Sequence, residues 1–307
     1  MTYVKQQTLR NVGTLTGIGL HSGRYITMRL HPAESDHGII FVRTDLSDGK
    51  NNIPARWDYV TDTKMCTVIA NEHGASVGTI EHLMSALRGC GIDNALIEID
   101  CLEVPAMDGS AMPFVKMIEE AGIAAQDSPR RMIRVLKEVS IERDGKLATL
   151  KPDNTSIFEG EIDFDHAKIG KQRYTTQLVN GNFKHDIACA RTFGFKWDAE
   201  WLRSQGLGLG ASLDNAIVLD EDSIMNEKGL RFNDEFIRHK LLDAIGDLYL
   251  AGGQILGRYS ADKGGHEINN AILHELFSDP DNWEYVTVGS DSTHTNQGLR
   301  EKQMAYA

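Results

Sequence analysis

The chain has 307 residues, of which 41% are hydrophobic and 25% charged, values that are ordinary for a globular protein with a sizeable core. Its formal charge of −12 argues against a nucleic-acid partner and against broad attachment to anionic lipid, although a local basic patch could still bind a phosphorylated small molecule. No apolar run reaches the roughly 18 residues of a membrane span, and residues 1–8 lack the hydrophobic region of a signal peptide. These features predict a soluble cytoplasmic protein, and the length favours two domains.

The cysteines limit the kinds of metal site that are available. The four residues are widely separated and form no Cys-x-x-Cys pair: Cys66, Cys90, Cys101 and Cys189. This spacing excludes the usual thiolate zinc patterns and gives no disulfide framework. Any metal site in this chain must therefore use histidine and carboxylate ligands.

The first part of the chain is predicted to be strand-rich. Residues 8–30 alternate as in a β-hairpin that turns around Gly17–Gly23, with Leu20 and His21 at an exposed tip. Three further segments are rich in β-branched residues and are predicted to be strands: 38–43, 65–70 and 94–100. A turn at 104–110 leads into an amphipathic helix at 111–121.

A short helix is predicted over residues 79–88, with Thr79 as N-cap and a stop at Gly89. Glu81 and His82 both lie in its first turn and point about 100° apart, so they can serve one site in different roles. A lone helical histidine is more often a surface or core residue, and a first-turn glutamate suits the helix dipole. This pair alone does not establish a site.

The polar stretch 127–131, which contains a proline, is predicted to be a linker between domains at 1–126 and 132–297. Strands are expected at 133–142 and 147–151, joined by an Asp144-Gly145 hairpin, and at 157–164. Both halves run from strands to a helix with candidate ligands, which is consistent with a structural duplication.

Residues 193–213 combine tryptophans and leucines with glycines. Composition favours a short helix and strand that pack on the core over the alternative, a flexible insertion that holds an acyl chain. The last residues, 298–307, are typical of a mobile tail.

A longer helix is predicted over residues 231–247, capped by Asn233 and ended by Gly252-Gly253. His239, Asp243 and Asp247 recur every four residues along one stripe of it, and a histidine and carboxylate one turn apart can share a metal ion. Spacing alone favours a solvated face with an ordinary ion pair.

Two details of this helix favour the metal. A cation ahead of an anion is the poorer orientation for a simple helical ion pair. Gly246 costs roughly 1 kcal/mol relative to alanine inside a helix, which is easier to understand if something approaches the backbone there. His266 follows on a glycine loop before a final helix, where a histidine is frequently only a solvated surface residue.

Five motifs occur in a fixed order along the chain: Thr79-Ile-Glu-His-Leu83, residues 105–114, Ala190–Phe195, His239–Asp247 and Gly265-His266. Together with the glycine-rich stretch 17–23, they resemble the UDP-3-O-acyl-N-acetylglucosamine deacetylases. These are the zinc amidases at the committed step of lipid A synthesis in Gram-negative bacteria. The resemblance extends from the first residues to about Tyr285.

The resemblance implies an α+β fold of two similar domains, each a sheet layered with helices, with the active site at their interface and an acyl-chain insertion at about 193–213. It implies Zn²⁺ bound by His82, His239 and Asp243. It also implies catalytic roles for Glu81 as general base, His266, its neighbour Asp247, and Thr192 as an oxyanion donor. The substrate contacts that it implies are Lys240, Phe164, Asp163, Phe193 and Leu20.

The expected reaction is hydrolysis of an N-acetyl group with release of acetate. Three protein ligands leave zinc a position for water, Glu81 can take the proton of that water, and zinc with Thr192 can stabilise the oxyanion. A cationic His266 can protonate the leaving amine, although Glu81 alone could act as both base and acid. The partner is an acylated UDP-amino sugar, the protein is expected to be a monomer, and transient contact with a membrane surface stays open.

Two alternatives remain at this point. One is a zinc amidase that acts on another N-acetylated sugar. The other is a metal-free protein that binds a nucleotide sugar or lipid, in which the histidines and carboxylates form ordinary ion pairs.

Overall fold

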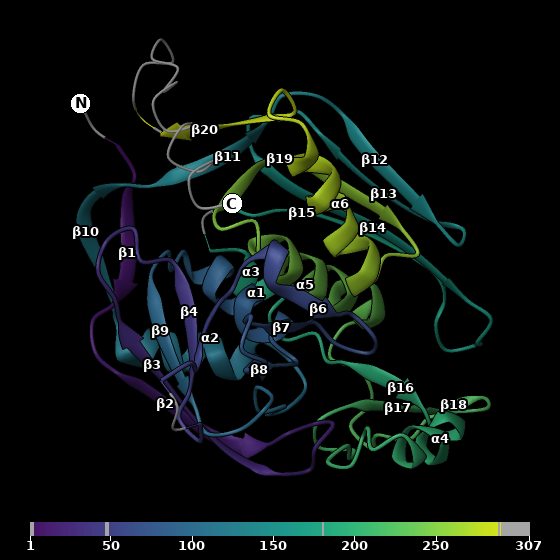
Figure 1. The fold of residues 1–307 in the computed structure, drawn as a ribbon. Helices are drawn as coiled ribbons and strands as arrows, with labels where there is room; N and C mark the ends of the chain where they lie inside the picture. The colour runs from purple at the N-terminus through teal and green to yellow at the C-terminus, as the bar shows by residue number, and fades with distance from the viewer. Residues whose placement is uncertain (1–2, 47–48, 180, 288, 290–307) are drawn as a thin grey trace.

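The computed structural model describes residues 3–46, 49–179, 181–287 and 289, so the predicted tail at 298–307 lies outside the described residues. The described part of the chain is a mixed α/β structure with five sheets and six α-helices. Two sheets are large, and Figure 1 shows helices α1, α2 and α5 between them.

The first large sheet comes from the N-terminal part of the chain and has the strand order β2-β3-β9-β4-β5. Burial alternates along β3 and β9, as expected for strands with one face on a core. The predicted hairpin is confirmed because β2 pairs antiparallel with β3, but His21 in its turn is buried rather than exposed. The strands are β2 (Gly13–Ile18), β3 (Tyr25–Pro32), β4 (Ile39–Arg43), β5 (Asn52–Pro54) and β9 (Ala95–Ile99).

The second large sheet has seven strands and comes from the rest of the chain. The hairpin prediction at Asp144-Gly145 is confirmed, with φ of 50° and 71° at the two residues. The single strand predicted over 133–142 is wrong, because that segment divides between β11 and β12, which pair with different neighbours. The strands are β11 (Arg131–Val135), β12 (Val139–Arg143), β13 (Lys146–Lys151), β14 (Ser156–Phe164), β15 (Gly170–Gln177), β19 (Gln254–Asp262) and β20 (Trp283–Thr287).

The segment between the two large sheets is itself extended. β10 (Ile123–Pro129) pairs with β1 (Lys5–Leu9) in a two-stranded sheet, and β11 begins two residues after β10 ends. Residues 127–129 of the predicted linker therefore belong to a strand. Arg130, between the strands, is held by Asp93 through Nε at 2.9 Å from Oδ1.

Two three-stranded sheets complete the structure. One contains β6 (Val60–Asp62), β7 (Val68–Ala70) and β8 (Ser76–Val77), and follows the 3-10 helix η1 (Trp57–Tyr59). The other contains β16 (Phe193–Phe195), β17 (Ile217–Asp220) and β18 (Ser223–Ile224), with η2 (Lys196–Asp198) and α4 (Ala199–Ser204) beside it.

The composition-based expectation for 193–213 is confirmed only in part. The segment contains the short strand β16 and the short helix α4, and Phe193 and Phe195 pack against a buried apolar cluster, but other large apolar side chains are exposed. Trp197 is 53% exposed, Trp201 50% and Leu209 52%. The segment projects from the body of the protein at the lower right of Figure 1.

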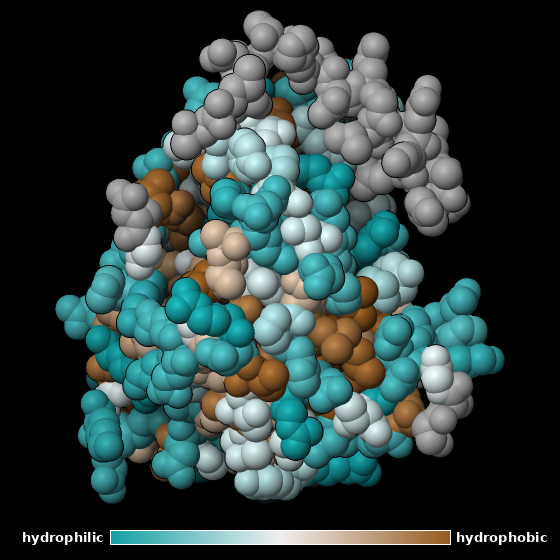
Figure 2. Space-filling model, turned by 90° about the vertical axis from the view of Figure 1, so that its left-hand side faces the viewer, coloured by the Kyte–Doolittle hydropathy of each residue, from teal (hydrophilic) through white to brown (hydrophobic). Residues whose placement is uncertain are grey.

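The helices join the two large sheets through one continuous core. α1 (Glu81–Cys90) packs against α5 (Glu235–Tyr249) and α2 (Met112–Ala121), and α6 (His266–Ser278) covers β12 and β13. The short α3 (Phe183–Asp186) adds Phe183 to this core. None of the described helices has the length and apolar character needed to cross a membrane, and on the face in Figure 2 apolar residues are scattered among polar ones.

Two predicted helix starts are wrong. α1 begins at Glu81, because Thr79 has a φ of 54° and its hydroxyl lies 3.3 Å from Glu103 instead of capping the helix. α1 also continues past Gly89 to Cys90. α5 begins at Glu235 after Asp234, so Asn233 is not its cap.

Candidate active site

The site forms where α1 and α5 pack together, and Gly246 determines how closely they approach. A Cβ atom at Gly246 would lie 2.0 Å from the carbonyl oxygen of Glu81 and 3.0 Å from the backbone nitrogen of Ser85. No side chain fits at that separation, which explains the glycine inside α5. The predicted close approach to the backbone is confirmed, and α1 is the element that makes it.

The polar stripe of α5 is buried rather than solvated. His239, Asp243 and Asp247 are each 2% exposed, because α1, α6 and the segment before β16 cover that face. The interpretation favoured by helix spacing alone is therefore wrong. Burial of charged groups is costly unless they are paired or bind a metal, so this stripe requires a partner.

His82 and His239 converge on the carboxylate of Asp243. The Nε2 atoms of His82 and His239 lie 3.5 Å and 3.4 Å from Asp243 Oδ1, and the three possible ligand atoms are within 4.8 Å of one another. Oδ1 is buried and has no hydrogen-bond partner. An unpartnered carboxylate oxygen facing two imidazole nitrogens fits a divalent cation.

A second layer of contacts orients His239. Its Nδ1 lies 3.1 Å from the carbonyl oxygen of Ala190, which leaves Nε2 free to act as a ligand. The Ala190 segment is fixed in turn by a buried ion pair, in which Arg191 Nε donates to Glu235 Oε1 at 2.8 Å. The motif 190–195 thus holds a histidine on α5.

The protonation states of this group suit a metal. Burial lowers the pKa of His239 to about 3, so its imidazole is neutral at pH 7. Burial opposes ionisation of Asp243, but the Lys240 ammonium and a hydrogen bond from His82 favour the charged form, and the pKa of this carboxyl lies well below its usual range. Neutral histidine and ionised aspartate are the forms that bind zinc.

Glu81 and His266 face one another beside this group. His266 is the first residue of α6, and its Nε2 lies 3.9 Å from Glu81 Oε1, while its Nδ1 lies 2.8 Å from Asp247 Oδ2. Burial raises the pKa of Glu81. Burial lowers the pKa of His266, but the carboxylates of Asp247 and Glu81 outweigh this effect and raise it to about 9.

Two residues that the sequence did not single out complete the environment of Asp247. Thr67 donates its hydroxyl to Asp247 Oδ1 at 2.6 Å, and Asn269 donates Nδ2 to Asp247 Oδ2 at 2.8 Å. A threonine before a strand and an asparagine inside a helix carry no local signal of such a role, since the contacts depend on segments 180 and 22 residues away.

Some of the predicted substrate contacts lie together. The Phe193 ring lies 5.8 Å from the Phe164 ring and 6.3 Å from the His239 ring, and Lys240 Nζ lies 5.8 Å from the Phe193 centroid. Lys240 Nζ also lies 3.2 Å from Asp243 Oδ2. An aromatic wall with one cation therefore adjoins the His–His–Asp group.

The other predicted site residues are located by contacts with neighbouring segments, and not by contacts with the His–His–Asp group. Asp163 is exposed on β14, beside Phe164. Leu20 accepts the Gly210 N–H at 3.1 Å, which ties the hairpin turn to the 193–213 segment. Thr192 lies between Arg191 and Phe193 and donates its N–H to the carbonyl oxygen of Gly109 at 2.8 Å.

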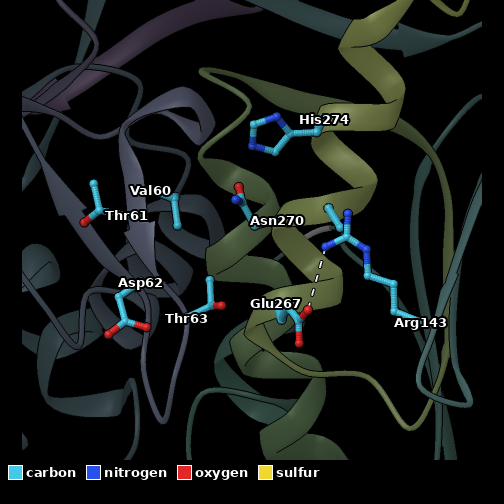
Figure 3. A pocket seen from close by; sticks show the side chains of 9 residues that line it. Val60, Thr61, Asp62, Thr63, Arg143, Glu267, Asn270 and His274 are labelled. Atoms are coloured by element: carbon cyan, nitrogen blue, oxygen red, sulfur yellow. Dashed lines mark ion pairs between the residues drawn. The ribbon is translucent and has the colours of Figure 1, made fainter.

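A separate cavity of about 410 Å³ lies between β6 and α6 (Figure 3). Glu267, Asn270 and His274 line it from one face of α6, and Thr61 and Thr63 line it from the opposite side. Figure 3 shows Glu267 paired with Arg143 at its edge. Among the described residues, the only group of three ligands close enough for one metal is His82, His239 and Asp243, so this cavity offers no second metal centre.

Comparison with known proteins connects this geometry to one family. Residues 6–278 match the family LpxC: UDP-3-O-acyl N-acetylglycosamine deacetylase. The chain is 47% identical over 297 residues to a UDP-3-O-acyl-N-acetylglucosamine deacetylase of Haemophilus influenzae strain 86-028NP, covering 96% of this chain and 97% of the relative.

Other relatives agree. The enzyme of the same name from Pasteurella multocida is 47% identical over 92% of this chain and 93% of its own. That from Stenotrophomonas maltophilia strain K279a is 48% identical over 94% and 96%. With identity at this level across nearly its whole length, the chain belongs to the UDP-3-O-acyl-N-acetylglucosamine deacetylase family.

Proposed function

We propose that the protein removes the N-acetyl group from a UDP-3-O-acyl-N-acetylglucosamine by hydrolysis, releasing acetate in the biosynthesis of lipid A. The observation that carries the proposal is the buried convergence of His82 and His239 on Asp243, beside the Glu81–His266 pair, in a chain of this family. A protein that only binds a ligand would not need so many buried ionisable side chains, whose burial destabilises the fold.

The metal in this proposal is zinc, held by His82, His239 and Asp243. The unpartnered Asp243 Oδ1 and the neutral His239 fit a cation that accepts nitrogen and oxygen ligands. When bound, zinc supplies a Lewis acid that makes water more acidic and stabilises negative charge on an oxygen. The buried surroundings strengthen both effects, because screening by solvent is weak there.

The residues of the chain provide proton transfer. Glu81, with its raised pKa, takes the proton of the attacking water. His266, kept cationic by Asp247, gives a proton to the leaving amine, which would otherwise depart as an unstable anion. The Thr192 hydroxyl adds a hydrogen bond to the developing oxyanion.

Substrate recognition uses the aromatic wall and its cation. Lys240 contacts the polar part of the substrate and Phe193 its apolar part, while Phe164 and Asp163 bind the nucleotide. The 193–213 segment, tied to Leu20, guides the acyl chain. The half-exposed tryptophans of that segment support this role, because they leave apolar surface unburied until a ligand covers it.

We further propose that residues 1–126 and 132–297 act as two domains with the active site between them, in a monomer located in the cytoplasm. Glu81 and His82 come from the first domain, and His239, Asp243 and His266 from the second. α1 and α5 carry the contact between them.

The function is tested by measuring acetate release from UDP-3-O-acyl-N-acetylglucosamine and from UDP-N-acetylglucosamine, which lacks the acyl chain. The acylated substrate is expected to be hydrolysed with the larger kcat/KM, because only it reaches the apolar segment. Hydrolysis of other N-acetylated sugars at equal rates, or no hydrolysis of either compound by zinc-loaded protein, would overturn the proposal.

The pH profile should depend on Asp247. The rate is expected to fall as the pH rises through the pKa of His266, since only its cation can donate a proton. Asp247→Asn removes the anion that raises this pKa, so the alkaline limb should move down by about 1–3 pH units. The measurement is kcat/KM against pH for both zinc-loaded proteins.

Asp127→Asn provides the control, because Asp127 is exposed, pairs with Lys5 and is not part of the site. Its profile should match that of the wild type. If the alkaline limb of Asp247→Asn also coincides with the wild type, His266 is not the acid, and Glu81 serves both roles.

A further inference from the structure

We propose that Thr67 is a positioning residue for the reaction, one that fixes the two carboxylates of the acid–base machinery relative to each other. The proposal rests on the function argued above and concerns how its proton-transfer groups are held. Thr67 directly precedes β7 and is 1% exposed, so its polar groups are shielded from bulk solvent and need hydrogen-bond partners inside the protein.

Thr67 donates a hydrogen bond to each of these carboxylates. Its backbone N–H donates to Glu81 Oε2 at 3.1 Å, and its hydroxyl donates to Asp247 Oδ1 at 2.6 Å. Glu81 begins α1 and Asp247 lies in α5. One residue outside both helices thus bridges them at their functional carboxylates.

Each bond selects which oxygen faces the reaction. The Thr67 N–H occupies Glu81 Oε2, so Oε1 is the oxygen that faces His266 Nε2 at 3.9 Å. The hydroxyl occupies Asp247 Oδ1, so Oδ2 is the oxygen that binds His266 Nδ1 at 2.8 Å. The two donors of Thr67 therefore direct both carboxylates towards His266.

Asp247 is held from the opposite side as well. Asn269 donates to Asp247 Oδ2 at 2.8 Å, and its own Oδ1 accepts the hydroxyl of Tyr259 at 2.5 Å. With Oδ2 shared between Asn269 and His266, Thr67 is the hydroxyl that binds the other oxygen. Without it the carboxylate could rotate, and the imidazole of His266 would rotate with it.

A buried threonine beside a strand usually only packs. Here the hydroxyl donates to a charged oxygen, and such bonds are about twice as strong as neutral ones. The bond also links the small sheet β6–β7–β8 to the site, because Thr67 directly precedes β7 and contacts Glu81 in the first turn of α1 and Asp247 in the last turn of α5.

Thr67→Val tests the inference, because valine keeps the shape and the backbone N–H and removes only the hydroxyl. We expect kcat to fall about 10- to 100-fold, the loss typical of a hydrogen bond to a charged group, with little change in KM or zinc content. Thr67→Ser, which restores the hydroxyl, should recover most of the rate. If the valine variant does not fold, Thr67→Ser and Thr67→Ala, which differ by one oxygen, supply the same comparison.

Two further proteins show through which residue Thr67 acts. Thr149→Val, which removes a buried hydroxyl that pairs with Ser140 away from the site, should leave kcat unchanged. In an Asp247→Ala background, Thr67→Val should cost nothing more, because the partner of the hydroxyl is already absent.

The outcomes separate the inference from the function. An inactive wild type overturns the proposed function. An active wild type with an unaffected Thr67→Val variant overturns the positioning role alone. A Thr67→Ser variant as slow as Thr67→Val also overturns it, because packing of the methyl group would then be what matters.

Discussion

Replacing Glu81 with alanine is expected to lower kcat by about 10²- to 10⁴-fold, the contribution typical of a positioned general acid–base group. Glu81 is buried, its pKa is raised, and its Oε1 faces His266 across 3.9 Å. It lies outside the His82–His239–Asp243 group, so the variant should bind zinc as the wild type does. The measurements are acetate release and zinc content of the same preparation.

Glu81→Gln refines this result, since glutamine keeps an oxygen for the Thr67 N–H and loses the ability to accept a proton. It should be as slow as the alanine variant if proton transfer is the role of Glu81. Glu119→Ala, which removes a partly exposed carboxylate paired with Lys184, should be fully active. Zinc content that falls together with activity in Glu81→Ala would instead identify Glu81 as a ligand.

Removing the metal is expected to reduce acetate release to the background of the assay, and adding zinc should restore it. Stability should follow, because the ligands join α1 to α5. A ligand present at 1,000 times its dissociation constant stabilises the folded state by about 4 kcal/mol. The melting temperature of chelator-treated protein should therefore be lower and should rise again with zinc.

Asp243→Ala should reproduce both effects without a chelator, because it removes the oxygen on which the two histidines converge. His31→Ala is the matched control, since His31 pairs with Glu98 in the first large sheet and is not part of the His82–His239–Asp243 group. An apoprotein that hydrolyses the substrate at the rate of the zinc-loaded enzyme would contradict the metal mechanism.

The sequence predicted which side chains come together at the site better than it predicted what surrounds them. The four-residue spacing of His239, Asp243 and Asp247 correctly aligned them on one face of a helix, because that spacing follows from helix geometry. It could not say whether the face is buried, since burial depends on α1, about 150 residues earlier. Gly246 was the local indication of that contact, because a glycine inside a helix lowers its stability and close packing against α1 explains why it is there.

Thr67 lay beyond sequence reasoning for a related reason. Its role depends on two contacts that are 14 and 180 residues distant, and nothing in its neighbours marks it. Thr79 was misassigned because a threonine before a helix usually caps it, whereas here its backbone is left-handed and its hydroxyl turns to Glu103. Predictions from local sequence therefore failed where contacts between distant segments determine the conformation of the chain.

The contact at Gly246 has a consequence for how such an enzyme can diversify. Because α1 and α5 meet backbone to backbone, the separation between Glu81 and the ligands on α5 is set by atoms that every sequence shares. Exchanging Phe164, which does not contact a ligand of the proposed metal, can then reshape the surface that recognises substrate without altering the reaction centre. We expect variation among relatives to collect at such positions, while position 246 admits no side chain, so that selectivity can evolve independently of catalysis.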